Sequence, residues 1–339
     1  MTQHRTFTLE TRPSGELKDS DLGRHEQPVA APSEGQIQIR TTYLSIDPTI
    51  RIWMSDEPQY MPPIAIGEVV RCLGVGVVEQ SAHPDYAAGD RVVGLLGWAT
   101  HPTIEPAANF VQTLPAELPL PDAKVLSLLA LTSGMTAYIG LLDVGQPKEG
   151  ETLVVDGAAG SVGSLVGQIG KIKGCRVVGI AGGPDKCRYA TETLGLDACI
   201  DYKNADVGAG LDEHCPDGID VCFENVGGPI FDEILLRMNN FGRVSVCGLI
   251  AGYNAAGSKD KQPGPYAFPM VLMRRLRIQG FIVSDHADRF AEASKDLLTW
   301  AGEGRIKTLE DVRKGFDQLP EALRQLLRGE KHGKLVVEL

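Results

Sequence analysis

The segment VVDGAAGSVGSLVGQ (154–168) constrains the fold of this chain more than any other. An apolar strand runs into a glycine-rich turn and then into a helix, which is the order that a dinucleotide-binding fingerprint requires. Gly160 allows the backbone to approach a pyrophosphate, and Gly163 allows the helix to pack closely on the strand. An ordinary tight turn between strand and helix is the alternative. A second strand at the expected distance favours the dinucleotide interpretation.

The rest of the chain divides into a strand-rich first part and an alternating second part, and 339 residues fit two domains. Short apolar alternations punctuated by Gly and Pro continue to about residue 122, and no long helix is expected there. After that point, helical segments separate most of the strands expected at 152–156, 176–181, 198–202, 218–228, 242–249 and 276–283. This alternation predicts a parallel sheet covered on both faces. Two amphipathic helices at 286–304 and 309–329 and a last strand at 334–339 complete the pattern.

Charge and cysteine content exclude several classes of protein. The net charge of −11 disfavours general binding to nucleic acid. The seven cysteines form no C-x-x-C pair, so zinc ribbons and thioredoxin-like sites are excluded, and reduced thiols in a cytoplasmic protein are expected. The polar N-terminus lacks the apolar core of a signal peptide. Small and polar residues interrupt the apolar stretch 125–142, which we interpret as two buried helical segments and not as a membrane span.

The end of the second strand indicates which nicotinamide cofactor is bound. An NAD site places Asp or Glu at this tip to bind the ribose 2′-hydroxyl, but here the strand ends in Ala181-Gly182-Gly183. Lys186 and Tyr202 follow, and a cation with a phenol can hold a 2′-phosphate. Asp185 is a rival, although a carboxylate in a first helical turn is commonly a cap. The sequence therefore favours NADP(H) over NAD(H). A solvated Lys186 and a Tyr202 that only packs remain the alternatives.

Several segments together resemble a known family nearly from end to end: YLSIDPTIR (43–51), SGMTAYIGLL (133–142), GAAGSVGSLVGQIGKIKGCRVVGIAGG (157–183), DYKN (201–204), CFENVGG (222–228), VCGLIAGYN (246–254) and GFIVSD (280–285). The chain is similar to medium-chain dehydrogenases/reductases, in the zinc-independent branch of alkenal/one, prostaglandin and curcumin reductases. This resemblance implies an α/β fold with a Rossmann doubly wound parallel sheet at 126–314. It also implies a GroES-like β-barrel domain built from 1–125 and 315–339, an active site in the cleft, and a homodimer.

No metal site is expected. Catalytic zinc in the wider superfamily needs an early Cys, a Gly-His-Glu segment and a later Cys or Asp. Here the corresponding segment is Ile66-Gly67-Glu68, which lacks the histidine, and neither a Cys in YLSIDPT nor the four-Cys structural lobe is present. Simple alcohol–ketone exchange is therefore disfavoured, because no Lewis acid polarises the carbonyl. A short-chain dehydrogenase is disfavoured too, since no Tyr-x-x-x-Lys occurs.

Tyr253 is the candidate catalytic residue. An α,β-unsaturated ketone or aldehyde accepts hydride at its β-carbon, and the resulting enolate oxygen needs a positioned neutral donor. A phenol remains protonated at neutral pH and can donate. Tyr253 follows the strand at 242–249, on the edge where open α/β sheets bind ligands. The family similarly has a Tyr here, whereas residues alone leave a surface-loop tyrosine as the alternative.

Other positions carry over from the family's motifs as cofactor-binding candidates, and simple core packing is the alternative for each apolar one. Together with Tyr253, the cofactor-binding candidates are Met135, Thr136, Ala159, Gly160, Ser161, Val162, Gly163, Gly182, Lys186, Tyr202, Asn225, Val226, Cys247, Gly248, Phe281, Ile282 and Val283. Two departures matter. Thr49-Ile50 stands where the family often has Tyr-Met, so a pocket aromatic is missing. Lys331 stands where the family commonly has Asn, so a cation replaces a polar cofactor contact.

These observations predict an NADPH-dependent reductase of the C=C bond of enones and enals. A quinone reductase on the same fold is the alternative enzyme, because quinones also accept hydride without a metal. A non-catalytic NADPH-binding protein is the alternative from another class. No nucleic-acid or membrane partner is expected.

Overall fold

The computed structural model describes residues 3–255 and 264–339. The chain forms two compact units. The first comprises Met1–Leu126, Tyr253–Lys259 and Glu310–Leu339, and the second comprises Ser127–Gly252 and Asp260–Leu309. The domain boundary expected at 314/315 differs from this division, because residues 310–314 form a strand of the first unit. The short segment that begins at Tyr253 also belongs to the first unit, which the sequence did not suggest.

The second unit contains a six-stranded, fully parallel sheet in the order β10-β9-β8-β11-β12-β13. Its strands are β8 (Thr152–Asp156), β9 (Arg176–Ala181), β10 (Ala198–Asp201), β11 (Ile219–Glu224), β12 (Met238–Val246) and β13 (Arg277–Gly280). The chain runs outward from β8 to β10, returns to β11 beside β8, and continues outward to β13. The strand order therefore reverses between β8 and β11, which is where doubly wound folds bind dinucleotides.

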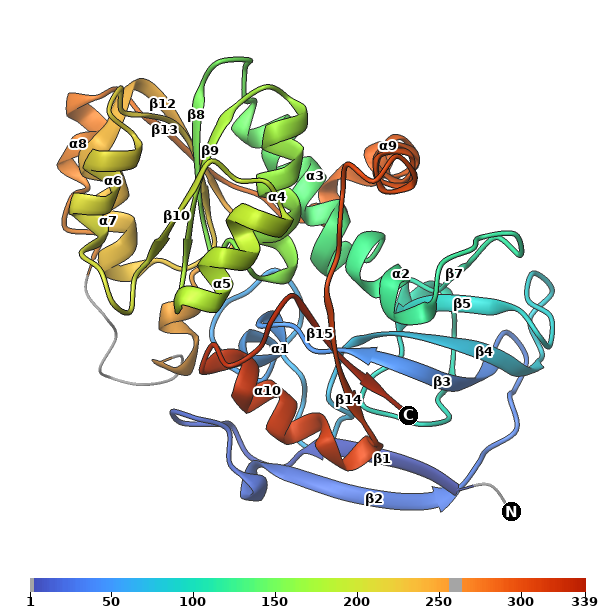
Figure 1. The fold of residues 1–339 in the computed structure, drawn as a ribbon. Helices are drawn as coiled ribbons and strands as arrows, with labels where there is room; N and C mark the ends of the chain where they lie inside the picture. The colour runs from blue at the N-terminus through green and yellow to red at the C-terminus, as the bar shows by residue number, and fades with distance from the viewer. Residues whose placement is uncertain (1–2, 256–263) are drawn as a thin grey trace. The chain divides into compact units, whose positions relative to one another are not determined.

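Helices cover both faces of this sheet, as the sequence predicted (Figure 1). They are η3 (Leu131–Met135), α3 (Thr136–Ile139), η4 (Gly140–Gly145), α4 (Ser161–Ile172), α5 (Pro184–Arg188), η5 (Tyr189–Thr193), α6 (Val207–His214), α7 (Gly228–Arg237), α8 (Pro269–Met273), η7 (Val283–Arg289) and α9 (Phe290–Gly302). Leu211 of α6 and Phe231 and Ile234 of α7 pack in one buried cluster with Val154 and Ile180 of the sheet. Burying both faces explains why β8 and β9 are almost continuously apolar.

The first unit is built on a seven-stranded sheet in the order β14-β15-β3-β4-β5-β7, with β6 also paired to β3. A separate hairpin pairs β1 with β2. The strands are β1 (Gln3–Leu9), β2 (Leu22–Pro28), β3 (Ile37–Ser45), β4 (Leu73–Ser81), β5 (Arg91–Leu95), β6 (Thr103–Ile104), β7 (Gln112–Thr113), β14 (Glu310–Lys314) and β15 (Lys334–Glu338). The short helices are η1 (Asp19–Asp21), α1 (Thr49–Trp53), η2 (Ala107–Asn109), η8 (Phe316–Gln318) and α10 (Leu319–Leu327). The helices α2 (Asp122–Leu128) and η6 (Ile250–Ala255) contain two of the points where the chain passes between units.

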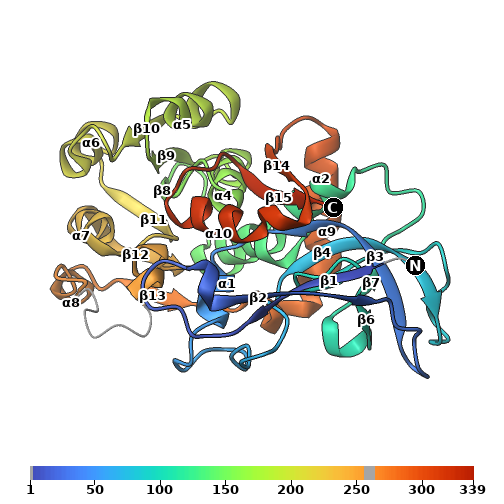
Figure 2. The ribbon, with the colours of Figure 1, turned by 90° about the horizontal axis from the view of Figure 1, so that it is seen from below.

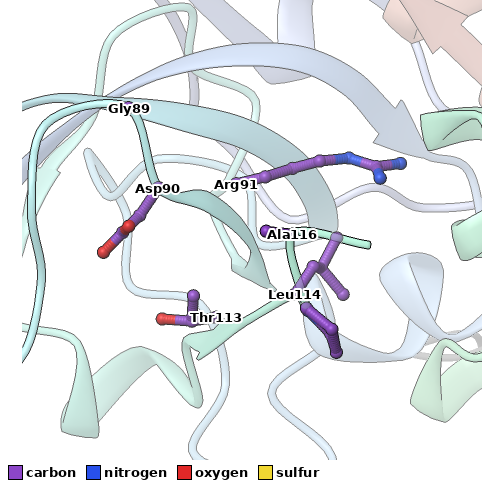
Figure 3. Close-up of a pocket in the computed structure, with 7 residues that line it drawn as sticks. Gly89, Asp90, Arg91, Thr113, Leu114 and Ala116 are labelled. Carbon is purple, nitrogen blue, oxygen red and sulfur yellow. The ribbon is translucent and has the colours of Figure 1, made fainter. Parts of the chain in front are cut away.

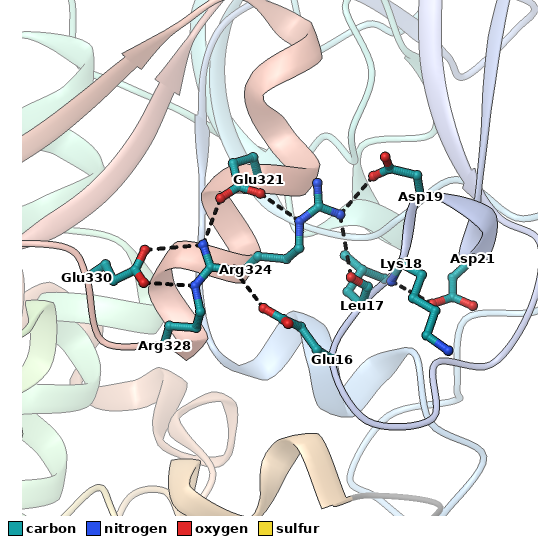
Figure 4. Close-up of polar contacts among 9 residues, drawn as sticks. All are labelled: Glu16, Leu17, Lys18, Asp19, Asp21, Glu321, Arg324, Arg328 and Glu330. Atoms are coloured by element: carbon teal, nitrogen blue, oxygen red, sulfur yellow. Dashed lines mark hydrogen bonds and ion pairs between the residues drawn. The ribbon is translucent and has the colours of Figure 1, made fainter.

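The C-terminal tail returns to the first unit, as the family resemblance implied. β15 pairs antiparallel with β3, so that Val336 lies opposite Ser45. In both views the red α10 and β15 lie with the blue N-terminal strands (Figures 1 and 2). Side chains of α10 join the two ends further: Arg328 contacts Glu16, and Arg324 contacts Asp19 (Figure 4).

One predicted helix was wrong. Residues 309–329 were expected to be helical throughout, but β14 occupies Glu310–Lys314 and only α10 is a helix of length there. β14 pairs in parallel with β15, and Gly315 then adopts a φ of 97°, which ends the strand sharply. The partner of β14 lies beyond α10 in the chain, so the pairing overrides a local pattern that favours helix.

The apolar stretch at 125–142 lies within a helical run, Asp122–Gly145, that is long and apolar enough to cross a membrane by length and composition. Of its most apolar window, 72% is buried inside the structure, as in the core helix of a folded domain. Breaks in the helical pattern divide the run into α2, η3, α3 and η4.

Candidate functional site

The glycine-rich turn joins β8 to α4 at the reversal of strand order. Gly157 has a φ of 59°, which bends the chain at the end of β8. A Cβ at Gly163 would lie 2.4 Å from the Gly157 carbonyl oxygen, so only glycine permits this close approach of helix and turn. The sequence predicted that Gly163 packs on the strand, whereas its close contacts are with Gly157 and Ala158 of the turn that follows β8.

The N-terminus of α4 provides the features of a pyrophosphate site. Gly160 is the N-cap residue, and no side chain caps the helix. The first N–H groups of a helix lack intrahelical acceptors, and the helix dipole places partial positive charge there. Ser161 Oγ donates to Ser133 Oγ at 2.8 Å, which ties the first turn to the neighbouring η3. The 12-residue α4 therefore offers donors and a favourable potential to an anion at this turn.

At the far end of β9, the structure brings Gly182 and Tyr202 together. A Cβ at Gly182 would lie 2.9 Å from the ring and hydroxyl of Tyr202, so the aromatic side chain rests directly on the glycine. Tyr202 follows β10, is 42% exposed, and its N–H donates to the Ala181 carbonyl at 3.1 Å. The phenol is thus held at the strand tip where an NAD site has its carboxylate.

Two lysines lie at the same edge. Lys186 is half-buried in α5, and burial together with the positive charge of Lys203 lowers its pKa. Lys203 directly follows Tyr202, and the sequence reasoning did not single it out. Two cations close enough to repel each other favour the arrival of an anion, because an anion relieves their repulsion.

Two carboxylates near this edge already have other partners. Asp185, the rival for the ribose, pairs with Arg188 one turn later. Asp201 accepts hydrogen bonds from the Gly183 N–H at 2.7 Å and from the Asn204 amide at 2.7 Å. These contacts lower the pKa of Asp201, so it stays ionised and organises the loops around the tip.

The residues expected near the nicotinamide lie on several elements of the second unit. Met135 ends η3, and Thr136 begins α3 and donates to the Leu131 carbonyl at 2.5 Å. The Phe281 ring packs against Phe223 with centroids 6.4 Å apart, and a Cβ at Gly140 would lie 2.3 Å from it. Because the Phe281 ring packs against Phe223, the backbone of segment 281–283, and not this ring, is the part available to bind a ligand.

The loop after β12 is fastened to the loop after β11. The N–H groups of Cys247 and Gly248 donate to the Glu224 carbonyl at 2.9 and 3.1 Å. Two further N–H groups, of Ile250 and Ala251, donate to the Asn225 and Val226 carbonyls. The half-buried Tyr253 follows this fastened segment within η6, and it belongs to the first unit.

Comparison with known proteins assigns the chain to a family. Residues 5–112 match a family described as the N-terminal domain of oxidoreductase, and residues 161–299 match one described as zinc-binding dehydrogenase. An NADPH-dependent curcumin reductase of Escherichia coli (strain K12) is 44% identical, with 99% of this chain and 97% of that protein covered. Prostaglandin reductase 1 of Rattus norvegicus is 36% identical, with 100% of each covered.

A solved structure agrees with these relatives. CurA of Vibrio vulnificus in complex with NADPH has a TM-score of 0.92 and 39% identity, with 98% of each chain covered. The chain belongs to the medium-chain dehydrogenase/reductase superfamily, in its zinc-independent branch. The α/β fold with a Rossmann sheet and a second, largely antiparallel unit is the fold expected of this superfamily.

The segment Ile66-Gly67-Glu68, at the position of the superfamily's zinc-binding histidine, forms a local turn. Among residues 3–255 and 264–339, no group of three or more His, Cys, Asp or Glu side chains is arranged to hold a metal ion. Gly67 forms the turn after the exposed Ile66, and Glu68 accepts a hydrogen bond from the Ala65 N–H at 2.7 Å. Glu68 therefore helps to close a local turn.

Lys331, the cation that replaces a family asparagine, lies just before β15 and donates to the Gly333 carbonyl at 2.7 Å. It belongs to the first unit, so its role toward a cofactor bound by the Rossmann unit remains a prediction. A pocket of about 500 Å³ in the first unit, lined by Gly89, Asp90, Arg91, Thr113, Leu114, Pro115 and Ala116, contains none of the predicted site residues (Figure 3). Its arginine already pairs with Asp122 at 2.6 Å.

Sequence reasoning missed two side chains at the centre of the Rossmann unit. Asp156 and Glu224 are the last residues of the neighbouring strands β8 and β11, and both are fully buried. The available signal was an acidic residue that ends an apolar strand, in TLVVD and again in CFE. Acidic residues are rarely fully buried unless paired, so their position needs an explanation.

Proposed function

We propose that the protein is an NADPH-dependent reductase of the C=C bond of α,β-unsaturated ketones and aldehydes. The observation that carries this proposal is the 44% identity to a curcumin reductase over nearly the whole chain. The similarity to prostaglandin reductase 1 supports the same kind of substrate. Curcumin is an enone, and reduction of such a bond needs hydride delivery and enolate stabilisation without a metal.

The residues present fit the cofactor. The turn from Gly160 to Gly163 would hold the pyrophosphate, because a Cβ at Gly163 would strike the turn and the helix N-terminus favours an anion. Lys186 and Tyr202 would hold the 2′-phosphate beside Gly182. When bound, the cofactor supplies the hydride. Asn225, Cys247, Gly248 and the backbone of 281–283 would line the remainder of its site.

Tyr253 would act on the substrate oxygen. As hydride reaches the β-carbon, negative charge moves to the carbonyl oxygen, and a phenol O–H donated to that oxygen lowers the barrier. The α-carbon then takes a proton from water or from Tyr253. Thr49, in place of a family aromatic, donates or accepts a hydrogen bond with the Tyr60 hydroxyl at 2.6 Å, so a phenol of this chain lies beside the altered position.

The first test is NADPH oxidation against matched panels of enones, enals, benzoquinones and saturated ketones. We expect turnover of enones and enals that is much faster than turnover of quinones, and none of saturated ketones. Faster quinone turnover would support the quinone reductase. NADPH binding without turnover of any acceptor would support the non-catalytic alternative.

The second test concerns the hydroxyl of Tyr253. In Tyr253→Phe, single-turnover hydride transfer to a simple enone should slow by about 10²–10³-fold, the usual effect of losing an oxyanion donor. Single turnover is the informative measurement because product release can limit kcat. NADPH affinity should change little. A wild-type rate in the variant would exclude the proposed role.

Cofactor choice is tested at the 2′-phosphate edge. Lys186→Ala should weaken NADPH binding by about tenfold or more and leave NADH binding nearly unchanged, since only NADPH carries the phosphate dianion. Lys295→Ala, an exposed lysine of α9, is the matched control and should affect neither cofactor. Equal affinities of the wild-type protein for NADPH and NADH would contradict the proposed selection.

Metal independence, a cytoplasmic location and a homodimer complete the proposal. Exhaustive chelation should leave activity intact, and a stoichiometric zinc linked to activity would contradict this part of it.

A further inference from the structure

The reversal of strand order in the Rossmann sheet contains two facing carboxyl groups. Asp156 ends β8 and Glu224 ends β11, the two strands between which the order reverses. Both residues are 0% exposed, and the Val226 N–H donates to both carboxyl groups, at 3.1 Å to Asp156 Oδ2 and at 2.8 Å to Glu224 Oε1. Within the described part of the chain, neither forms an ion pair with Lys, Arg or His. Two buried like charges without a cation are strongly unfavourable.

Backbone donors explain part of this arrangement. Asp156 accepts from the Asn225 N–H at 2.6 Å and from the Val226 N–H at 3.1 Å. Glu224 Oε1 accepts from the Val226 N–H at 2.8 Å and from the Gly227 N–H at 2.5 Å. Three consecutive N–H groups of the turn after β11 therefore bind one pair of carboxyls. A nest of this kind attracts negative charge.

One oxygen of the Asp156–Glu224 pair lacks a hydrogen bond, so the backbone N–H groups do not satisfy both carboxyl groups. Glu224 Oε2 is buried and has no hydrogen-bond partner in the described part of the chain. The two carboxyl groups share the Val226 N–H, and a proton held between them would supply the missing donor. Burial and the charge of Glu224 raise the pKa of Asp156 well above its usual range, and burial raises the pKa of Glu224 as well.

The other titratable groups that face the pair are thiols. Cys222 of β11 and Cys247 after β12 both have a raised pKa, first because of burial and then because of the two carboxyls. Neutral thiols bring no compensating charge. A single proton held between Asp156 and Glu224 would therefore remove one of the two buried negative charges.

We propose that Asp156 and Glu224 share one proton and that this pair positions the Asn225–Gly227 turn for the cofactor. The turn in turn holds the next loop, because the Asn225 and Val226 carbonyls accept from Ile250 and Ala251 at 3.1 and 2.9 Å. The two acids are positioning residues, since they act through this backbone. The cofactor part of the proposal rests on the proposed function, whereas the shared proton does not.

Loss of the proton at high pH would place two negative charges in contact and push the turn away from its geometry. NADPH affinity should therefore fall as pH rises, by up to about tenfold per pH unit above the titration of the pair. Asp156→Asn imitates the protonated acid: its carbonyl can accept from Asn225, and its amide can donate to Glu224. This variant should keep its affinity across the range in which the wild type loses it.

The experiment combines infrared spectroscopy with cofactor titration on the full chain. At pH 7 the wild type should show the carbonyl stretch of a buried protonated carboxyl group, and the band should vanish in Asp156→Asn. NADPH dissociation constants between pH 7 and pH 9 should rise for the wild type and stay nearly level for the variant. Glu224→Gln is the second variant if Asp156→Asn folds poorly, and it should also remove the band.

Asp220→Asn is the matched control. Asp220 belongs to β11 as well, but it is near the opposite end and accepts from the Thr152 N–H at 2.9 Å. This change should alter neither the band nor the pH profile. Absence of the band in the wild type, or the same pH profile in Asp156→Asn, would overturn the proposal. If NADPH does not bind at any pH, the proposed function and the positioning role fail, while the band still reports on the shared proton.

Discussion

Each unit of this protein buries acidic side chains at the end of a strand, but the two units compensate the buried acids in opposite ways. In the first unit, Lys334 Nζ contacts Asp47 Oδ1 at 2.5 Å, and both side chains are buried. Ser45 donates a second hydrogen bond to the same carboxylate. In the second unit, Asp156 faces Glu224, and their donors are backbone N–H groups.

The Asp47–Lys334 pair and the Asp156–Glu224 pair position different parts of the chain. Asp47 and Lys334 are 287 residues apart, and their opposite charges join the C-terminal strand to the loop after β3. Asp156 and Glu224 shape a short turn at the edge proposed to bind the cofactor. A carboxyl pair can present two acceptors to adjacent N–H groups, but it needs a proton to be neutralised. The first cluster therefore compensates its buried carboxylate with a lysine, whereas the second needs a proton and responds to pH.

Removing the cation of the first unit should have the largest effect. Lys334→Met removes the cation that the buried Asp47 carboxylate contacts and should lower the free energy of unfolding by about 3–5 kcal/mol. Urea unfolding of the full chain, followed by tryptophan fluorescence, measures this loss. The double variant Asp47→Asn/Lys334→Met should lose less than Lys334→Met alone, because no uncompensated charge remains. A loss below about 1 kcal/mol in the single variant would remove the contrast between the two clusters.

The Asp156–Glu224 pair should make the free energy of unfolding depend on pH. A carboxyl with a raised pKa in the folded state keeps a proton that the unfolded chain has released, so stability falls as pH rises above the ordinary carboxyl range near 4. The slope is at most about 1.4 kcal/mol per pH unit for one proton. Between pH 5 and pH 8 we expect the wild type to lose about 3–4 kcal/mol relative to Asp156→Asn, because the folded state keeps its proton over most of this range. Parallel pH profiles of the two proteins in urea unfolding would show that the pair holds no extra proton.

The smallest effect is expected from the hydroxyl that supports the ion pair. Ser45→Ala removes one hydrogen bond to Asp47 while Lys334 remains, and it should cost about 1.5 kcal/mol, the lower end of the range for bonds to charged groups. The same urea unfolding measurement gives this loss. A loss as large as that of Lys334→Met would mean that the cavity or the lost donor, and not charge compensation, dominates at this cluster.

The alternation of strands and helices in the second unit was predictable from the sequence. The strands at 152–156 and 176–181 lie where the apolar runs placed them, because each run is short, buried on both faces and ended by a glycine-rich turn. The interval 309–329 was not predictable in the same way. Its charged first residues look helical alone, and only the neighbouring β15 makes them a strand.

In the candidate site, too, some residues could be predicted from local sequence, and others depend on tertiary contacts. The residues of the glycine-rich turn and of the 2′-phosphate edge could be named from the sequence because their requirements are local: a backbone approach, a helix N-terminus, a missing carboxylate. The Gly182–Tyr202 contact and the nearby Lys203 could not, since they depend on how β9 and β10 align. Tyr253 came from the family resemblance, and its role stays a prediction.

By itself the sequence determined that a dinucleotide-type turn exists, that a metal ligand set is incomplete and that the tip of the second strand carries no acid. Each of these depends on neighbours within a few residues. Only the tertiary structure decided that β14 and β15 complete the first sheet and that Asp156 meets Glu224 at the reversal of strand order. Asp156 and Glu224 are 68 positions apart, and β15 pairs not only with β14 but also with β3, which lies near the other end of the chain. Strand register brings such residues together, and register is a property of the packed sheets that no local pattern contains.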